Sequence, residues 1–182
     1  MLSNLCVKQR KQLAAAVFLL WFLAVLWAFW FFQFRHFGVF AADLNTSVHA
    51  NFEAGAWLSS TYVGAAPEGS IVVQHFIDPA CPCSRFTHRH VLELEQRFVA
   101  KRVYFERASQ LAQSLQPEQA PAVAIWDEQG RLAYFGPYSS GVFCGQGRDF
   151  VEATLLNLAK GRNPRWINHD VLGCFCPWEN KA

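Results

Sequence analysis

The chain has 182 residues, of which 52% are hydrophobic and 16% are charged, and its formal net charge is +2. This length suits one domain of ordinary size together with an additional segment. Three of the 16 Lys and Arg residues precede residue 12, so the part from Arg35 onward carries 13 basic residues against all 14 acidic ones. A near-neutral body without a basic run gives no reason to expect nucleic acid as a partner.

Residues 12–34 are 23 consecutive residues without a charge, rich in Leu, Ala, Phe and Trp. As a helix, this run is ~34 Å long, slightly more than the ~30 Å hydrocarbon core of a bilayer. Trp27 and Trp30 lie near its end, where indole rings suit the membrane interface. We therefore predict a transmembrane helix at 12–34 that anchors the chain in the lipid bilayer. A cleaved signal peptide is the alternative, but its apolar region is shorter and Phe40-Ala41-Ala42 is a weak cleavage site.

The charges that flank this run predict its orientation. Lys8, Arg10 and Lys11 precede it, and the first acidic residue is Asp43. Because positive charge stays on the cytoplasmic side, residues 1–11 are expected in the cytoplasm and the body of the protein outside it. In a Gram-negative bacterium this topology is a single pass through the cytoplasmic (inner) membrane with the domain in the periplasm.

Residues 35–70 are expected to be a tether with a possible docking helix, and residues 71–161 to be the main domain. The run from Ile71 to Ile77 is rich in β-branched residues and predicts a strand buried on both faces. Ser84 to Phe98 carries one apolar stripe and predicts a helix.

The second half of the domain predicts shorter elements. These are a strand at 103–107, a possible helix at 109–119, a strand at 122–126, a turn at 127–130, an antiparallel strand at 131–135, a loop at 139–147, a helix at 149–160 and a Cys-containing tail at 162–182. This order indicates an α/β fold, with a mixed sheet and helices on its faces.

The sequence Cys81-Pro82-Cys83 lies between the predicted strand and the predicted helix. At that position the helix dipole favours a thiolate, and a second thiol two residues away can resolve a mixed disulfide. We expect a strained Cys81–Cys83 couple that oxidises or isomerises more readily than it reduces. A metal site, a structural pair, and a bond from one of these cysteines to another part of the chain are the alternatives.

Three further cysteines lie in the exported part: Cys144, Cys174 and Cys176. They are candidates for a structural disulfide that ties the tail to the 139–147 loop, in a compartment where disulfides persist. One of them can instead act as a second redox relay. A third possibility joins Cys81, Cys83, Cys174 and Cys176 in a four-thiolate site for Zn²⁺ or Cu(I). The exported count of five is odd, so at least one thiol is free, intermolecular or catalytic.

Residues 71–160 resemble the thioredoxin superfamily. The resemblance rests on the cysteine motif after the first core strand, Ala120-Pro121 directly before a strand, the hairpin at 126–136 and the final helix. It implies a thioredoxin-like mixed sheet flanked by helices, with a cis bond before Pro121, which faces the cysteines. The usual family motif is Cys-x-x-Cys, whereas here the spacing is one residue shorter. Where many members place a buried acid, six residues before the first cysteine, this chain has His75, whose imidazole can relay a proton.

The resemblance implies an enzyme, a thiol–disulfide oxidoreductase that acts on the thiols or disulfides of exported proteins. Cys81 attacks, Cys83 resolves, Pro121 shapes the substrate groove and His75 shuttles protons. No organic cofactor is expected, because nothing resembles a phosphate-binding glycine loop. Turnover requires a membrane-bound or soluble redox partner. The alternatives are a protein that handles Cu(I) through the same thiols and a non-catalytic adaptor that keeps the fold as a binding surface.

Overall fold

The structure is a computed structural model, and it describes residues 2–40, 62, 64–98, 102–108, 117–141, 149–168 and 170–178. The chain divides into two compact units, Met1–His36 and Phe37–Ala182. The docking helix expected within 43–63, most of the possible helix at 109–119 and the part of the loop that holds Cys144 lie outside the described residues.

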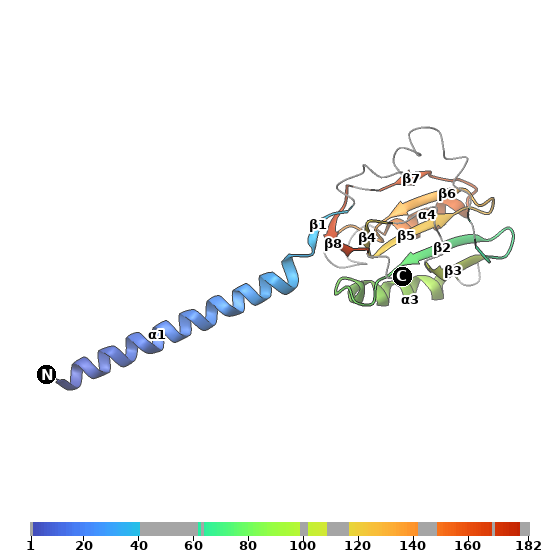
Figure 1. Cartoon of the computed structure of the whole chain (residues 1–182). Coiled ribbons are helices and arrows are strands. Elements are labelled where there is room, and N and C mark those ends of the chain that lie inside the picture. The colour runs from blue at the N-terminus through green and yellow to red at the C-terminus, as the bar shows by residue number, and fades with distance from the viewer. Residues whose placement is uncertain are drawn as a thin grey trace. The chain divides into compact units, whose positions relative to one another are not determined.

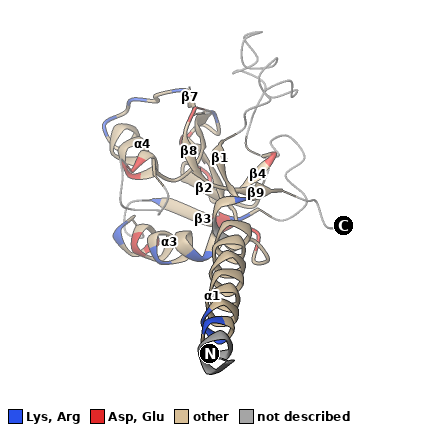
Figure 2. Ribbon diagram, turned by 90° about the vertical axis from the view of Figure 1, so that its left-hand side faces the viewer, with Lys and Arg blue, Asp and Glu red and all other residues tan. Residues whose placement is uncertain are grey.

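The first unit is a single long helix. The α-helix α1 (Leu2–Phe29) continues into a short π-helical turn, η1 (Trp30–Phe34). Residues Val7–Phe32 have a mean hydropathy of 2.3, and none of that apolar window is buried. A helix that is apolar on all sides and uncovered by protein is stable only in an apolar solvent. The chain thus has one N-terminal helix long and apolar enough to cross a membrane, with Lys and Arg gathered near its N-terminal end (Figure 2).

The second unit is built on a five-stranded mixed sheet with the order β3-β2-β5-β6-β7 (Figure 1). Its strands are β2 (Ile71–Phe76), β3 (Val103–Arg107), β5 (Ala122–Trp126), β6 (Leu132–Gly136) and β7 (Trp166–Ile167). The neighbours β2 and β3, and β6 and β7, are parallel, while β5 is antiparallel to both β2 and β6. The predicted α/β class, with a mixed sheet at its centre, is confirmed.

Two helices cover one face of this sheet. They are α3 (Ser84–Phe98) and α4 (Phe150–Leu158). Because side chains alternate along a strand, Val73 and Ile125 face these helices and pack with Leu94, Phe98 and Leu155 in one buried cluster. Asp149 caps α4 by accepting a hydrogen bond from the backbone N–H of Glu152 at 2.9 Å.

The opposite face is covered by short strands from the start, the middle and the end of the unit. These are β1 (Phe37–Val39), β4 (Gln119–Ala120), β8 (Leu172–Cys174) and β9 (Cys176–Pro177). Strand β1 pairs with β8, and β4 pairs with β9, both antiparallel. Phe40 and Phe175 pack edge to face at 5.1 Å over this side of the sheet. The expected tail at 162–182 therefore supplies three strands of the domain.

The hairpin between β5 and β6 is held by Asp127, which is 4% exposed. Its carboxylate accepts hydrogen bonds from the backbone N–H groups of Gln129 and Arg131 and from the side chains of Arg131 and Asn163. Burial raises the pKa of Asp127, but these hydrogen bonds outweigh it and leave the pKa below its ordinary value. The predicted turn at 127–130 is present, with Gly130 at a φ of 72°.

Candidate functional site: two Cys-x-Cys motifs joined by two disulfides

The Cys81-Pro82-Cys83 motif occupies the junction between β2 and α3, as predicted. The backbone N–H of Cys81 donates to the carbonyl of Asp78 at 3.1 Å, and Ser84 N–H donates to the carbonyl of Cys81 at 3.1 Å. Phe86 N–H donates to the carbonyl of Cys83 at 3.2 Å. The first N–H groups of α3 are thus bonded to carbonyls of the motif itself. The helix can favour a thiolate here through its dipole rather than through these N–H groups.

The second motif, Cys174-Phe175-Cys176, runs from the end of β8 to the start of β9. Cys174 lies opposite Phe37 in the β1–β8 pair, and Cys176 lies opposite Ala120 in the β4–β9 pair. In an extended segment, residues two apart point to the same side. Both sulfurs of this motif therefore face the Cys-Pro-Cys turn.

The four cysteines form two disulfides, Cys81–Cys176 and Cys83–Cys174, whose Cα atoms are 5.9 and 5.5 Å apart. The expected Cys81–Cys83 bond is not the pairing in this structure. The Cys81-Pro82-Cys83 turn lies beside a segment with the same two-residue spacing, so each of its sulfurs bonds to a different cysteine of that segment. The two motifs share the same spacing, and this match is the signal in the sequence that points to a paired arrangement.

The two disulfides lie against each other. The Sγ atoms of Cys83 and Cys176, which belong to different disulfides, are 3.9 Å apart. Neither sulfur carries a proton while it is bonded, so this is a van der Waals contact and not a hydrogen bond. The Sγ atom of Cys81 lies 3.8 Å from the carbonyl oxygen of Ala120. Together these four cysteines form a small cluster of their own in the domain.

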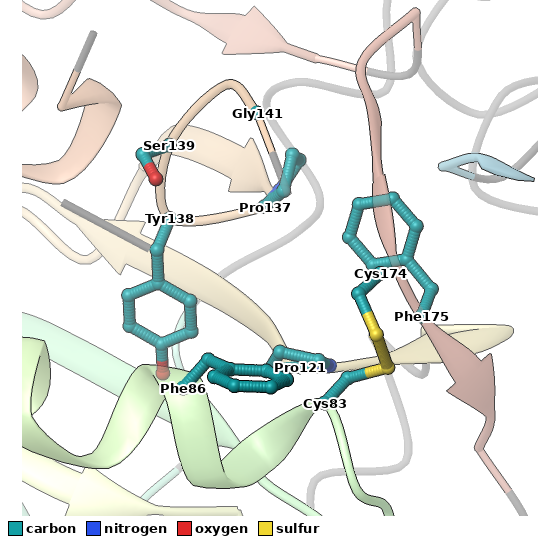
Figure 3. A pocket seen from close by; sticks show the side chains of 9 residues that line it. All are labelled: Cys83, Phe86, Pro121, Pro137, Tyr138, Ser139, Gly141, Cys174 and Phe175. Atoms are coloured by element: carbon teal, nitrogen blue, oxygen red, sulfur yellow. A yellow bond between two sulfur atoms is a disulfide. The ribbon is translucent and has the colours of Figure 1, made fainter. Parts of the chain in front are cut away.

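Access to the sulfurs is unequal. Cys81, Cys83 and Cys176 are 3%, 2% and 6% exposed, whereas Cys174 is only partly buried. A shallow pocket reaches the Cys83–Cys174 disulfide (Figure 3). It is lined by Cys83, Phe86, Pro121, Pro137, Tyr138, Ser139, Gly141, Cys174 and Phe175. The sulfurs are therefore approached from the side of Cys174.

The cis peptide bond expected before Pro121 is present, between Ala120 and Pro121. Pro121 lines the same pocket as Cys83 and Cys174 (Figure 3). The residue before it, Ala120, pairs with Cys176. Three segments far apart in sequence thus meet at this point: the Cys-Pro-Cys turn, the cis-proline segment and the C-terminal Cys-Phe-Cys segment.

His75 lies in β2 and is 1% exposed. Its Nδ1 atom shares a hydrogen bond of 2.6 Å with the hydroxyl of Tyr138, and its ring is parallel to that of Phe105 at 5.8 Å. Within the described part of the chain, its Nε2 atom has no hydrogen-bond partner. Burial, and then the positive charges of Arg107 and His90, lower the pKa of His75 to about 4. His75 is therefore neutral at pH 7 and a weak base, and it reaches the pocket through Tyr138.

Tyr138 is a site residue for which the sequence carried no signal. It lines the pocket and bonds to His75, yet the sequence shows only a tyrosine after a Gly-Pro pair. Cys144 lies outside the described residues, and its expected disulfide with the tail is not the pairing in this structure, because both tail cysteines are bonded elsewhere. The tail cysteines Cys174 and Cys176 are bonded to the Cys-Pro-Cys turn.

The donor set also has the chemistry of a soft-metal site. The Sγ atoms of Cys81, Cys83 and Cys176 all lie within 4.8 Å of one another. Sulfurs at ~2.3 Å from a tetrahedral Zn²⁺ are about 3.8 Å apart, and the 3.9 Å between the Cys83 and Cys176 sulfurs matches this value. The bonded Cys81 and Cys176 sulfurs would have to separate to reach it. Disulfide sulfurs carry no thiolate charge, so both disulfides have to be reduced before these residues can bind a metal.

The fold and the site together define an α/β domain with a four-cysteine, two-disulfide centre, which follows an N-terminal apolar helix in the chain. A family model described as a domain of unknown function (DUF6436) matches residues 51–178. The chain belongs to the DUF6436 family. No curated protein matches it at a significant level.

Two solved structures are similar to part of the chain. One is a hypothetical protein, SMc02350, from Sinorhizobium meliloti 1021, with 13% identity and a TM-score of 0.48 over 61% of this chain and 80% of that one. The other is an uncharacterized conserved protein from Geobacillus kaustophilus, with 15% identity and a TM-score of 0.49 over 64% of this chain and 82% of that one. At these values neither structure contributes to the assignment of function.

Proposed function

We propose that the protein is a membrane-anchored thiol–disulfide oxidoreductase with a thioredoxin-like domain, acting on exported proteins outside the cytoplasm. The observation that carries this proposal is the pair of adjacent disulfides at the entrance of α3, one of which is reached from a pocket that also holds cis Pro121. A disulfide that only staples a fold needs neither a second disulfide in contact with it nor a pocket that leads to it.

Several features support the thioredoxin-like part of the proposal. The resemblance leads one to expect a cysteine motif after a buried strand, a cis-proline beside it, a hairpin and a final helix. The chain has these features in Cys81–Cys83, Pro121, the β5–β6 hairpin and α4. The shorter spacing of the cysteines and the strands supplied by residues 166–177 are the features in which this chain departs from that pattern.

The anchor and its charges support an extracytoplasmic location. The apolar helix suits a lipid bilayer, and Lys8, Arg10 and Lys11 at its start favour a cytoplasmic N-terminus. The domain then lies in the periplasm of a Gram-negative cell, a compartment in which disulfides persist. A membrane-bound or soluble redox partner returns the cysteines to their starting state.

The chemistry is assigned to the cysteines. When the site is reduced, a thiolate of the Cys81/Cys83 pair attacks a disulfide of an exported protein, and when it is oxidised, a thiolate of the exported protein attacks a disulfide of the site. Pro121 forms one wall of the pocket where that exchange occurs. A base with a pKa near 4 is poorly matched to proton transfer at pH 7. For this reason we assign no proton-shuttling step to His75, although the sequence suggested one.

The test of this function is exchange with a protein substrate. The oxidised full-length chain in detergent is mixed with a reduced, unfolded test protein, and the loss of substrate thiols is followed. We expect the Cys83→Ser and Cys81→Ser/Cys83→Ser variants to fall to the uncatalysed rate, because neither can form the Cys83–Cys174 disulfide that the pocket reaches. The matched control is Cys6→Ala, at the far end of the apolar helix, which should keep the wild-type rate. Unchanged oxidation and reduction of the substrate by Cys83→Ser would rule the mechanism out.

A second candidate is a Cu(I)- or Zn²⁺-handling protein, favoured by the spacing of the Cys81, Cys83 and Cys176 sulfurs. The fully reduced chain is titrated with Cu(I) against a chromophoric chelator under anaerobic conditions. We expect tighter binding than by a free dithiol, and a loss of at least about tenfold in Cys176→Ser but not in Cys6→Ala. Binding no tighter than that of dithiothreitol ends this candidate. A non-catalytic adaptor, the third possibility, should be indifferent to the cysteines in both assays.

A further inference from the structure

The two disulfides differ in how solvent reaches them. The pocket touches Cys83 and Cys174, and of the four cysteines Cys174 alone is only partly buried. Cys81 and Cys176, which form the other disulfide, are 3% and 6% exposed. The rate of thiol–disulfide exchange depends on access to the sulfur that is attacked. We call Cys83–Cys174 the outer disulfide and Cys81–Cys176 the inner disulfide.

We propose that electrons enter this site only through Cys174, and that Cys83 then passes the exchange to the inner disulfide by attacking Cys176. This inference rests on the proposed function, because it specifies the order of events at the same cysteines. It assigns the entry role to a residue of the C-terminal segment, Cys174, and an internal relay role to Cys83. The resemblance alone leads one to expect Cys81 in the entry role.

The first step is reduction of the outer disulfide by an external dithiol. One thiolate of the dithiol forms a bond to Cys174 Sγ, the bond between Cys174 and Cys83 breaks, and its electron pair leaves on the Cys83 sulfur. The second thiolate of the dithiol then attacks the mixed disulfide and releases Cys174 as a thiolate, which takes up a proton. The dithiol is oxidised to a disulfide, and the chain gains two electrons.

The second step needs no further reagent. The freed Cys83 Sγ lies 3.9 Å from Cys176 Sγ, so its thiolate is already in contact with one end of the inner disulfide. Attack forms a Cys83–Cys176 bond, breaks the Cys81–Cys176 bond and leaves the electron pair on Cys81. Once protonated, Cys81 has the carbonyl of Ala120 at 3.8 Å as an acceptor. The number of disulfides does not change in this step.

The product has a consequence for the fold. In the two-electron-reduced chain, Cys81 and Cys174 are thiols while a Cys83–Cys176 disulfide still ties the C-terminal segment to the start of α3. The β4–β9 pairing between Ala120 and Cys176 is therefore held through the cycle. The buried Cys81 can therefore be reduced to a thiol while strand β9 stays bonded to the start of α3.

The experiment uses the oxidised full-length chain in detergent and substoichiometric dithiothreitol, followed by acid quenching and alkylation of free thiols. Tandem mass spectrometry locates the labels, since the backbone breaks readily between Cys81 and Pro82. We expect alkylated Cys81 and Cys174, with Cys83 and Cys176 joined. Labels on Cys83 and Cys174 with the inner disulfide intact would overturn the relay, and a Cys81–Cys83 product would overturn the assignment of Cys176 as the attacked sulfur.

A matched pair of variants tests the entry step. Cys81→Ser/Cys176→Ser keeps only the outer disulfide, and Cys83→Ser/Cys174→Ser keeps only the inner one. We expect dithiothreitol to reduce the outer disulfide at least about tenfold faster, because it is reached from the pocket. Equal rates, or a faster inner disulfide, would overturn the order. These readouts need no protein substrate, so their failure is distinguishable from a failure of the chain to exchange with exported proteins.

Discussion

Replacing all four cysteines of the site by Ala is expected to lower the free energy of unfolding by about 7 kcal/mol, whereas removing either disulfide alone costs about 2 kcal/mol. The two disulfides span 95 and 91 residues. In the chain-entropy account, the first bond to form closes a loop of that length and stabilises the fold by about 4.7 kcal/mol.

The second disulfide then closes a much smaller ring, made of Cys81-Pro82-Cys83 and Cys174-Phe175-Cys176. A ring of about six residues is worth only about 2 kcal/mol. The effects are therefore strongly non-additive, as expected for cross-links that share one loop. Because a domain has a stability of roughly 5–15 kcal/mol, losing both bonds removes a large part of it.

The measurement is urea unfolding of the full-length chain in detergent, followed by near-ultraviolet circular dichroism under oxidising conditions. The variants are Cys81→Ala/Cys176→Ala, Cys83→Ala/Cys174→Ala and the quadruple substitution. Cys6→Ala serves as the control and should unfold with the wild type. If the two double variants each cost half of the quadruple effect, the shared-loop explanation is wrong.

His75 is expected to make the stability of the domain fall by about 3 kcal/mol between pH 7 and pH 4. Its pKa is about 4 in the folded chain against 6.5 for an ordinary histidine. Since the folded state resists protonation, the unfolded chain binds more protons below pH 6.5. The contribution is fully present above pH 6.5, is lost progressively as the pH falls toward 4, and levels off below that value.

This pH dependence is measured by comparing unfolding curves of the wild type and His75→Gln at several pH values. Subtracting the unfolding free energies of His75→Gln from those of the wild type cancels the contribution of the Asp and Glu residues, which both chains share. Tyr138→Phe removes the hydroxyl that bonds to His75 but keeps the imidazole buried, so it should retain most of the slope. A His75→Gln chain with the same slope as the wild type would show that His75 is not the residue responsible.

Much of the fold can be derived from local patterns. The β-branched run at 71–76 and the single apolar stripe at 84–98 determine a buried strand and an amphipathic helix, and the structure has both with nearly the predicted bounds. The turn at 127–130 and the cap at Asp149 are held by hydrogen bonds between residues three or four apart. Such bonds depend on residue types that are neighbours in the sequence. The 23-residue uncharged run determines an apolar helix in the same way.

The site could not be derived from local patterns, because its parts are distant in sequence. The equal spacing of the two Cys-x-Cys motifs does not say which cysteine bonds to which, and the i, i+2 pair suggested a bond between Cys81 and Cys83. The contact between Tyr138 and His75 joins residues 63 apart and has no local signal. Nothing in the composition of residues 162–182 distinguishes a loose tail from a segment that pairs with the edge of β4.

The sequence by itself thus determined the strand, the helix and the place of the Cys-Pro-Cys motif between them, because hydrophobic periodicity and helix-start chemistry are local. Tertiary structure decided which sulfurs meet. The pairing of β9 with β4 sets Cys176 opposite Ala120, and the pairing of β8 with β1 sets Cys174 opposite Phe37. These pairings hold the second motif against the turn, where Cys81 and Cys83 bond to different cysteines. Those contacts join segments more than 50 residues apart, and only the packing of the whole domain brings them together.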